Sequence, residues 1–261
     1  KQPHGFGLRE DTQVRRLEMS AAKMLGKDDA IFLPSCTMAN QIAIQISCRP
    51  GDTVLAEVSS HVIVSEAGAP AAVSGVTMVG LQAESGRVTP DQVADVLDGP
   101  VPPKMIVLEN THTRSGGSVL DQGQVSAIAQ TCRRKGVRFH LDGARLANAA
   151  AATNSTLLEL AEAFDTVALS LNKGMCAPVG ALLAGRIDDI ERADRVRQWL
   201  GGGWRPATLL AAGGIAALED WRENLVAECI VPHLRRITRK ASPDMAATVD
   251  HRDRWAAEQR R

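Results

Sequence analysis

Short apolar runs alternate along this chain with segments in which apolar residues recur every three or four positions. Six runs have the length of β-strands and carry few charges: residues 30–34, 53–58, 105–110, 137–142, 166–171 and 180–185. The segments 89–99 and 121–136 have helical periodicity. The second ends in three cations and Gly136, a common helix terminus. Apolar strands separated by helices predict an α/β fold whose mostly parallel sheet is covered on both faces.

Polar side chains follow four of these predicted strands. They are Ser35 and Thr37 after the first, His112 after the third, Asp142 and Arg145 after the fourth, and Lys173 after the fifth. Each has an ordinary structural explanation, because small hydroxyl residues cap helices and Asp-Gly is a frequent turn pair. In open α/β sheets, however, ligands bind beyond the carboxyl ends of the strands. Their convergence therefore predicts a small-molecule site.

Lys173 stands in the otherwise apolar segment 166–185, where a buried ammonium is costly unless it is paired or neutralised. A lysine with a lowered pKa can form a Schiff base with an aldehyde. A carboxylate such as Asp142 can keep a pyridine nitrogen protonated. A helix that starts with Ser35 and Thr37 can bind a phosphate at its N-terminus. Together these properties favour pyridoxal 5′-phosphate as the cofactor.

Composition narrows the partners further. The 261 residues include 30 Lys and Arg and 30 Asp and Glu, so the net charge is zero. This charge gives no reason to expect binding to nucleic acid or to a membrane surface. No apolar run approaches the roughly 20 residues of a membrane span. Five cysteines without a C-x-x-C pair indicate free thiols, a cytoplasmic location and no zinc-finger type of metal site: Cys36, Cys48, Cys132, Cys176 and Cys229.

Six segments, in this order, carry a family resemblance: FLPSCTMANQIAI, SSHVIVSEAGAPAAVSGV, LENTHTRSGGSVL, HLDGARLANA, SLNKGMCAPVGALLAG and LGGGWRPATLLAAGGIAAL. On these segments the chain resembles the threonine aldolase and β-eliminating lyase family of pyridoxal-phosphate enzymes. That family has the aspartate-aminotransferase fold, called fold type I. The resemblance covers about residues 5–220. It implies a large cofactor-binding domain over 1–220 and a partial or divergent C-terminal segment over 221–261.

The resemblance also implies how the cofactor is bound. Lys173 would hold it through a Schiff base, Asp142 would pair with the pyridine nitrogen, and His61 would stack on the ring. The phosphate would be bound by Ser35, Cys36 and Thr37 in one loop, by Ser170, and by Arg205 of the same or a neighbouring subunit. A homodimer or homotetramer is therefore expected.

The implied substrate is an amino acid with a β-hydroxyl group. Arg145 would bind its α-carboxylate, and His112 would lie near the hydroxyl. The implied reaction cleaves threonine or allo-threonine to glycine and acetaldehyde.

Two other functions stay open. One is a related amino-acid racemase or β-eliminating lyase, because His112 could serve proton transfer instead. The other is a degenerate, non-catalytic homologue, because Cys36 stands where the family usually has glycine.

Overall fold

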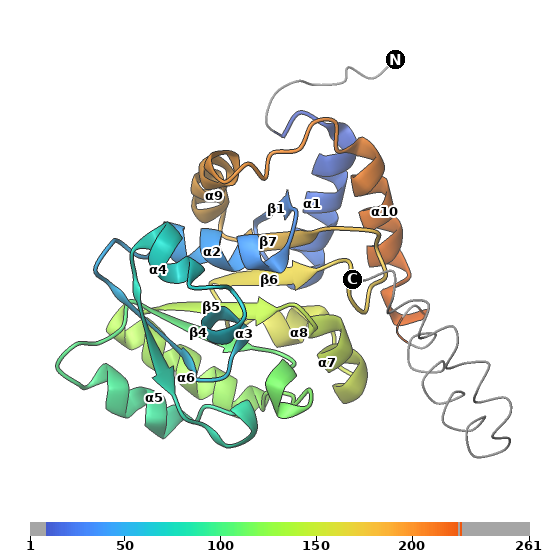
Figure 1. Cartoon of the computed structure of the whole chain (residues 1–261). Helices are drawn as coiled ribbons and strands as arrows, with labels where there is room; N and C mark the ends of the chain where they lie inside the picture. The colour runs from blue at the N-terminus through green and yellow to red at the C-terminus, as the bar shows by residue number, and fades with distance from the viewer. Residues whose placement is uncertain (1–8, 224, 226–261) are drawn as a thin grey trace, which may run out of the picture.

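A seven-stranded sheet forms the centre of the computed structural model, which describes residues 9–223 and 225 (Figure 1). The strands are β1 (Asp29–Leu33), β2 (Thr53–Glu57), β3 (Thr77–Leu81), β4 (Met105–Glu109), β5 (Arg138–Gly143), β6 (Thr166–Ser170) and β7 (Ala181–Gly185). Their order is β1-β7-β6-β5-β4-β2-β3. The neighbours from β3 to β6 pair in parallel, whereas β7 is antiparallel to β1 and β6. The mostly parallel α/β sheet predicted from the sequence is confirmed.

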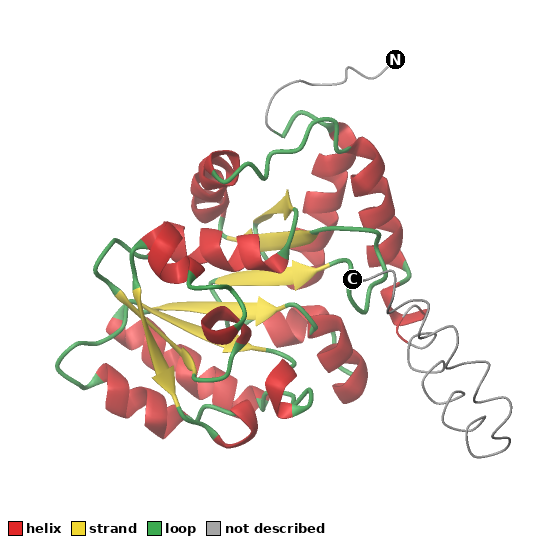
Figure 2. Ribbon diagram, viewed as in Figure 1, coloured by secondary structure: helices red, strands yellow, loops and turns green. Residues whose placement is uncertain are grey.

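Helices cover both faces of the sheet (Figure 2). One face carries α2 (Cys36–Ser47), α3 (His61–Val64), α4 (Ala69–Ser74) and α9 (Ile187–Trp199). The other carries α1 (Thr12–Leu25), α5 (Pro90–Leu97), α6 (Gln122–Lys135), α7 (Leu146–Thr153), α8 (Leu157–Ala161) and α10 (Thr208–Glu219). Side chains alternate across each strand: Met105 and Val107 of β4 pack on the α2 side, and Ile106 and Leu108 on the opposite side. The strands are therefore apolar on both faces.

The structure contains the six predicted strands and one that the pattern did not reveal. That strand, β3, lies at the edge of the sheet, and each of its residues is at least partly exposed. Its sequence TMVGL is nevertheless mostly apolar, so the pattern would have allowed a strand there. The direction of β7 was also not predicted. Only residues 171–180 separate β6 from β7, fewer than a parallel crossover needs.

The C-terminal segment expected over 221–261 lies mostly outside the described residues. Of it, Trp221 and Leu225 are buried in the core on the α1 side. In the described part of the chain, every helix is too short or too polar to cross a membrane.

Buried charged side chains bond to the open edge of β1. Phe32 N–H donates to Glu18 Oε1 at 2.9 Å, and Phe32 O accepts from Arg197 Nη1 at 3.1 Å. Glu18 lies 3.4 Å from Arg197 Nη1 and 3.1 Å from Arg15 Nη1, and its side chain has no exposed surface. Because buried backbone groups without partners are costly, these contacts hold α1 and α9 against the edge strand.

Replacing Glu18 with alanine should lower the free energy of unfolding by about 3–5 kcal/mol, because Phe32 N–H would lose its acceptor and the buried Arg197 would keep only Asp194 as a carboxylate partner among the described residues. Urea denaturation measures this change. The matched control is Glu219→Ala, which removes an exposed pair between Glu219 and Arg16 at 3.4 Å. That variant should lose less than about 1 kcal/mol. Equal losses in the two variants would contradict a structural role for the buried cluster.

Candidate active site

The ends of β5 and β6 meet the start of α2 on one side of the sheet. Asp142 lies in β5, Lys173 follows β6, and α2 begins at Cys36. Ser35 caps this helix, since its Oγ accepts the N–H of Met38 at 3.2 Å. Burial raises the pKa of the Cys36 thiol; the charge of Asp142 raises it further and that of Lys173 lowers it. The charges of Asp142 and Lys173 therefore both act on Cys36 at the start of α2.

Asp142 is a buried carboxylate with only 2% of its surface exposed. Its Oδ2 accepts from Asn40 Nδ2 at 2.8 Å and its Oδ1 from Ala144 N–H at 3.2 Å. Among residues 9–223 and 225 it forms no ion pair. Burial raises the pKa of Asp142, the charge of Glu109 adds to this, and the hydrogen bond from Asn40 opposes it. The site thus holds a carboxylate to which a cationic ligand could supply the missing counter-charge.

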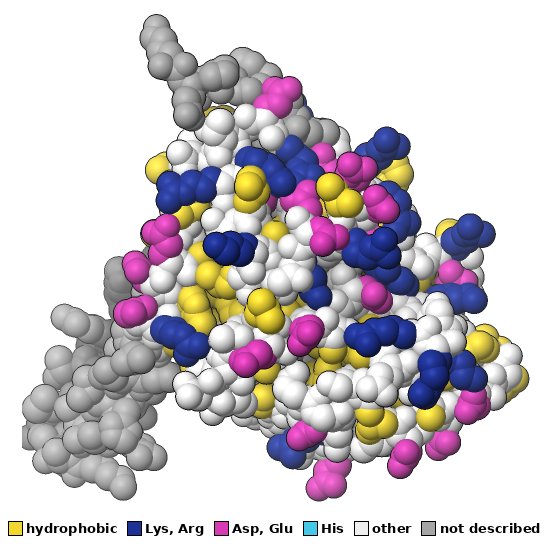
Figure 3. Space-filling view, turned by 180° about the vertical axis from the view of Figure 1, so that it is seen from behind, with side chains coloured by type: hydrophobic (Ala, Val, Ile, Leu, Met, Phe, Trp, Pro, Cys, Tyr) yellow, Lys and Arg dark blue, Asp and Glu magenta, His cyan; other side chains and the backbone are white. Residues whose placement is uncertain are grey.

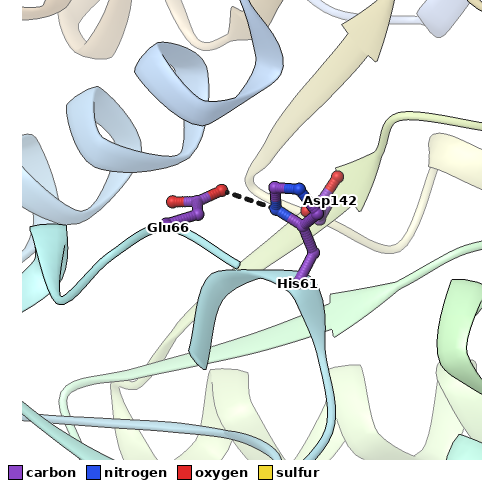
Figure 4. A group of neighbouring side chains, drawn as sticks. All are labelled: His61, Glu66 and Asp142. Carbon is purple, nitrogen blue, oxygen red and sulfur yellow. Dashed lines mark hydrogen bonds and ion pairs between the residues drawn. The ribbon is translucent and has the colours of Figure 1, made fainter. Parts of the chain in front are cut away.

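His61 and Glu66 lie beside Asp142 (Figure 4). The ligand atoms of these three residues lie within 4.8 Å of one another. His61 Nδ1 is 3.0 Å from Glu66 Oε1, which also accepts from Asn40 Nδ2 at 2.8 Å. Gln41 Nε2 donates to the other oxygen of Glu66. Because N–H donors occupy both oxygens of Glu66, we interpret this group as a hydrogen-bonded set rather than a metal site.

The His61 side chain should titrate above its ordinary pKa. The hydrogen bond to Glu66 raises the pKa of His61 from 6.5, although partial burial opposes the shift. A raised folded-state pKa means that His61 contributes stability fully below about pH 6.5, and that this contribution is lost as the pH rises through the folded value. An NMR titration should place the His61 midpoint above 6.5 in the protein and lower in Glu66→Gln. An unchanged midpoint in Glu66→Gln would show that Glu66 does not govern this ring.

His112 lies beside Glu109: its Nε2 is 3.9 Å from Glu109 Oε2, which also accepts from His61 N–H. It is buried, and its Nε2 lies 3.0 Å from Glu57 Oε2, although the ring nitrogens are not aligned for a hydrogen bond. Gly86, at φ +72°, covers the ring so closely that a Cβ there would overlap it. No contact within the described residues joins His112 to Asp142 or Lys173. Its expected place beside the substrate hydroxyl stays a prediction.

Glu109 links the turn after His112 to the helix that carries His61. Its Oε2 accepts from His61 N–H at 2.8 Å and its Oε1 from Thr113 N–H at 3.0 Å. Arg145, half-buried at the start of α7, donates from Nη1 to Thr113 Oγ1 at 2.7 Å. Its guanidinium is therefore held at the border of the site, and its role toward a substrate carboxylate stays a prediction.

Close packing fixes the turn that carries Lys173. A Cβ at Gly174 would lie 2.5 Å from Leu225 Cδ2 and 2.6 Å from Asn148 Oδ1, so a larger residue there would force these side chains to move. Ser170 Oγ donates to Asn172 Oδ1 at 2.8 Å at the end of β6. Lys173 itself is half-buried between these two fixed points.

The glycine-rich loop 201–207 borders the predicted phosphate loop. Gly202 packs on Met38 so closely that a Cβ would overlap its sulfur. Thr37, in the same turn of α2, is half-buried. Arg205 is exposed, and the described residues show no contact between it and Ser35 or Thr37. Its expected reach into a neighbouring subunit stays a prediction.

Sequence reasoning missed four buried polar residues around the site: Asn40, Glu66, Glu109 and His140. A signal was present in each case, because each is a polar residue within or beside a largely apolar segment. His140 is the clearest, since it lies two residues before Asp142 in a strand and so faces the same side of the sheet.

The sequence model of the family described as beta-eliminating lyase matches residues 7–250. The low-specificity L-threonine aldolase 1 of Arabidopsis thaliana is 36% identical over 219 residues, which are 80% of this chain and 61% of that protein. The low specificity L-threonine aldolase of Escherichia coli (strain K12) is 35% identical over 216 residues, 81% of this chain and 64% of that protein. The chain thus spans 61% and 64% of the length of these two relatives.

Solved structures are similar in fold. A Listeria monocytogenes protein assigned as an L-allo-threonine aldolase aligns with a TM-score of 0.74 and 26% identity, over 81% of this chain and 60% of that one. The threonine aldolase of Leishmania major aligns with a TM-score of 0.70 and 24% identity, over 82% and 64%. The second likeness concerns the fold alone.

Proposed function

We propose, since the chain belongs to the β-eliminating lyase family, that it is a pyridoxal-phosphate-dependent lyase that cleaves threonine or allo-threonine to glycine and acetaldehyde. One observation carries the proposal: the buried Asp142 carboxylate has no ion-pair partner among the described residues, and its charge and that of Lys173 both act on Cys36. The relatives' names supply the reaction and the substrate.

The residues present fit pyridoxal 5′-phosphate. Asp142 would hold the protonated pyridine nitrogen, which resolves its lack of a counter-charge, and Lys173 would bind the aldehyde carbon as a Schiff base. His61 would stack on the ring. The N-terminal N–H groups of α2, with the hydroxyls of Ser35 and Thr37, would bind the phosphate. When bound, this cofactor supplies an electron sink for the bond that breaks.

Two further residues would act on the substrate. Arg145 would bind the α-carboxylate through its planar guanidinium, from the position that Thr113 fixes. His112, or a water that it orients, would accept the proton of the β-hydroxyl. Glu57, 3.0 Å from His112 Nε2, would stabilise the resulting imidazolium.

Product analysis tests the proposed reaction. The purified chain is incubated with pyridoxal 5′-phosphate and either L-threonine or L-allo-threonine, and glycine and acetaldehyde are quantified. We expect the two products in equal amounts. An epimerised amino acid would instead indicate a racemase, and 2-oxobutanoate with ammonia would indicate β-elimination. Bound cofactor without any product would indicate a non-catalytic homologue.

We also propose a homodimer or homotetramer in the cytoplasm. Trp199 and Leu209 are 73% and 83% exposed and flank the 201–207 loop, and exposed large apolar residues favour a protein contact. Acidic and basic side chains lie interspersed over the face shown in Figure 3, which gives this face no extended basic patch. Cys36, Cys48, Cys132 and Cys176 are free, in keeping with a reducing compartment. Light scattering during size-exclusion chromatography measures the mass; a monomer would contradict the oligomer.

A further inference from the structure

We infer that Asn40 is a positioning residue whose carboxamide aligns Asp142 with the Glu66–His61 pair, and that His140 sets the orientation of this carboxamide. The inference rests on the proposed function only for the identity of the ligand that Asp142 and His61 would bind. The alignment itself concerns hydrogen bonds within the protein.

Asn40 uses both of its N–H donors on carboxylates. It is fully buried in α2, and Nδ2 lies 2.8 Å from Glu66 Oε1 and 2.8 Å from Asp142 Oδ2. A rotated carboxamide would turn its carbonyl oxygen toward two carboxylates and lose both bonds. One orientation of Asn40 is therefore strongly preferred, and in that orientation a single group bridges the two acids.

His140 bonds to the other end of the carboxamide. Its Nε2 lies 3.0 Å from Asn40 Oδ1, which can only accept, so Nε2 must carry the hydrogen. Nδ1, 2.8 Å from Thr166 Oγ1, then accepts from the hydroxyl. Burial lowers the pKa of His140 to about 3, which keeps the ring neutral. The hydrogen bonds therefore run in one direction from Thr166 through His140 to Asn40.

The sheet register brings these groups together. His140 and Asp142 are two residues apart in β5, so both face α2, and Thr166 is the direct partner of His140 in β6. Asn40 lies on α2 against this face. One strand thus presents a hydrogen-bond donor and a carboxylate to opposite ends of one carboxamide.

Two substitutions of His140 separate positioning from simple packing. In His140→Gln, the side-chain NH₂ falls near the place of Nε2 and can still donate to Asn40 Oδ1. In His140→Asn, the shorter NH₂ falls near the place of Nδ1 and cannot reach it. Both variants remove a buried ring, so thermal unfolding should show similar losses of stability. Only His140→Asn should disturb Asn40.

Two readouts follow the alignment. The first is the Kd for pyridoxal 5′-phosphate from tryptophan fluorescence: we expect His140→Asn and Asn40→Leu to weaken binding by about 10–100-fold, the size of effect seen when outer-shell partners are removed from metal sites. His140→Gln should weaken it by less than about 3-fold, because the donor is kept. The second is the titration of the ¹³C-labelled Asp142 carboxyl without cofactor. Its midpoint should rise in Asn40→Leu and His140→Asn, because a donor to the carboxylate is lost or misaligned.

Each outcome decides. The inference is supported if His140→Asn and Asn40→Leu raise the Asp142 midpoint and weaken cofactor binding, while His140→Gln keeps both close to the values of the unmodified protein. The inference is overturned if His140→Gln and His140→Asn, at matched stability, change the cofactor Kd and the Asp142 midpoint equally. It is also overturned if the Asp142 midpoint does not move in Asn40→Leu. If the unmodified protein binds no cofactor, the proposed function fails, while the Asp142 midpoints still decide the role of Asn40.

Discussion

Lys173→Ala should lose turnover by at least about 10²–10⁴-fold, because one residue supplies both the covalent link to the cofactor and an amine that can move protons. The side chain is half-buried in a turn that packs through Gly174 against α7. Glycine release from threonine measures the change.

Borohydride reduction locates the link directly. It converts a Schiff base to a stable secondary amine, so peptide mass analysis should find the cofactor on Lys173. The matched control is Lys23→Ala, at an exposed position in the last turn of α1, which should keep both the label and the turnover. A label on another lysine, together with unchanged turnover in Lys173→Ala, would refute the assignment.

Asp142→Asn should separate activity from stability. Turnover should fall on the order of 100-fold or more, because a neutral amide cannot stabilise the charge of a protonated pyridine ring. Without cofactor, the variant should be at least as stable as the parent protein. Burial raises the pKa of Asp142, which means that its charged form is unfavourable in the folded protein, and asparagine removes that charge.

Thermal unfolding without cofactor and turnover with cofactor are the two measurements for Asp142→Asn. Asp98→Asn is the control, since it neutralises an exposed carboxylate that pairs with Lys135 at 2.6 Å, and it should change neither quantity greatly. Lost stability with normal turnover in Asp142→Asn would mean that Asp142 serves the fold rather than the cofactor.

The sequence predicted the strands and the polar residues at their ends because both are local properties. An apolar run is buried on both faces, and a parallel sheet brings the carboxyl ends of its strands to one edge, so Asp142 and Lys173 could be expected at the same edge without knowledge of any contact. The partners of Asn40 could not be found in this way. Its bonds to Glu66, His140 and Asp142 join residues 26, 100 and 102 positions apart in the chain.

His112 marks the limit of the strand-end rule. The rule placed it correctly after β4, but the direction of its ring depends on Glu57 and Gly86, which belong to other segments. A strand end fixes where a loop starts, whereas packing against distant residues fixes where its side chains point. The direction of a side chain on a loop is therefore harder to predict from the sequence than that of a side chain at a strand end.

The contacts around β1 also bear on how copies of this chain can associate. An open edge strand is a template for another chain, and its pairing leads to aggregation or fibres. Here Phe32 N–H and O are already bonded to Glu18 and Arg197, and Ala30 O accepts from Arg9 at 3.4 Å. A strand of another chain would have to displace the buried charged side chains of Glu18 and Arg197 to pair with β1. Self-association of the folded protein should consequently proceed through side-chain surfaces such as that of Trp199 and Leu209, and not by extension of the sheet at β1.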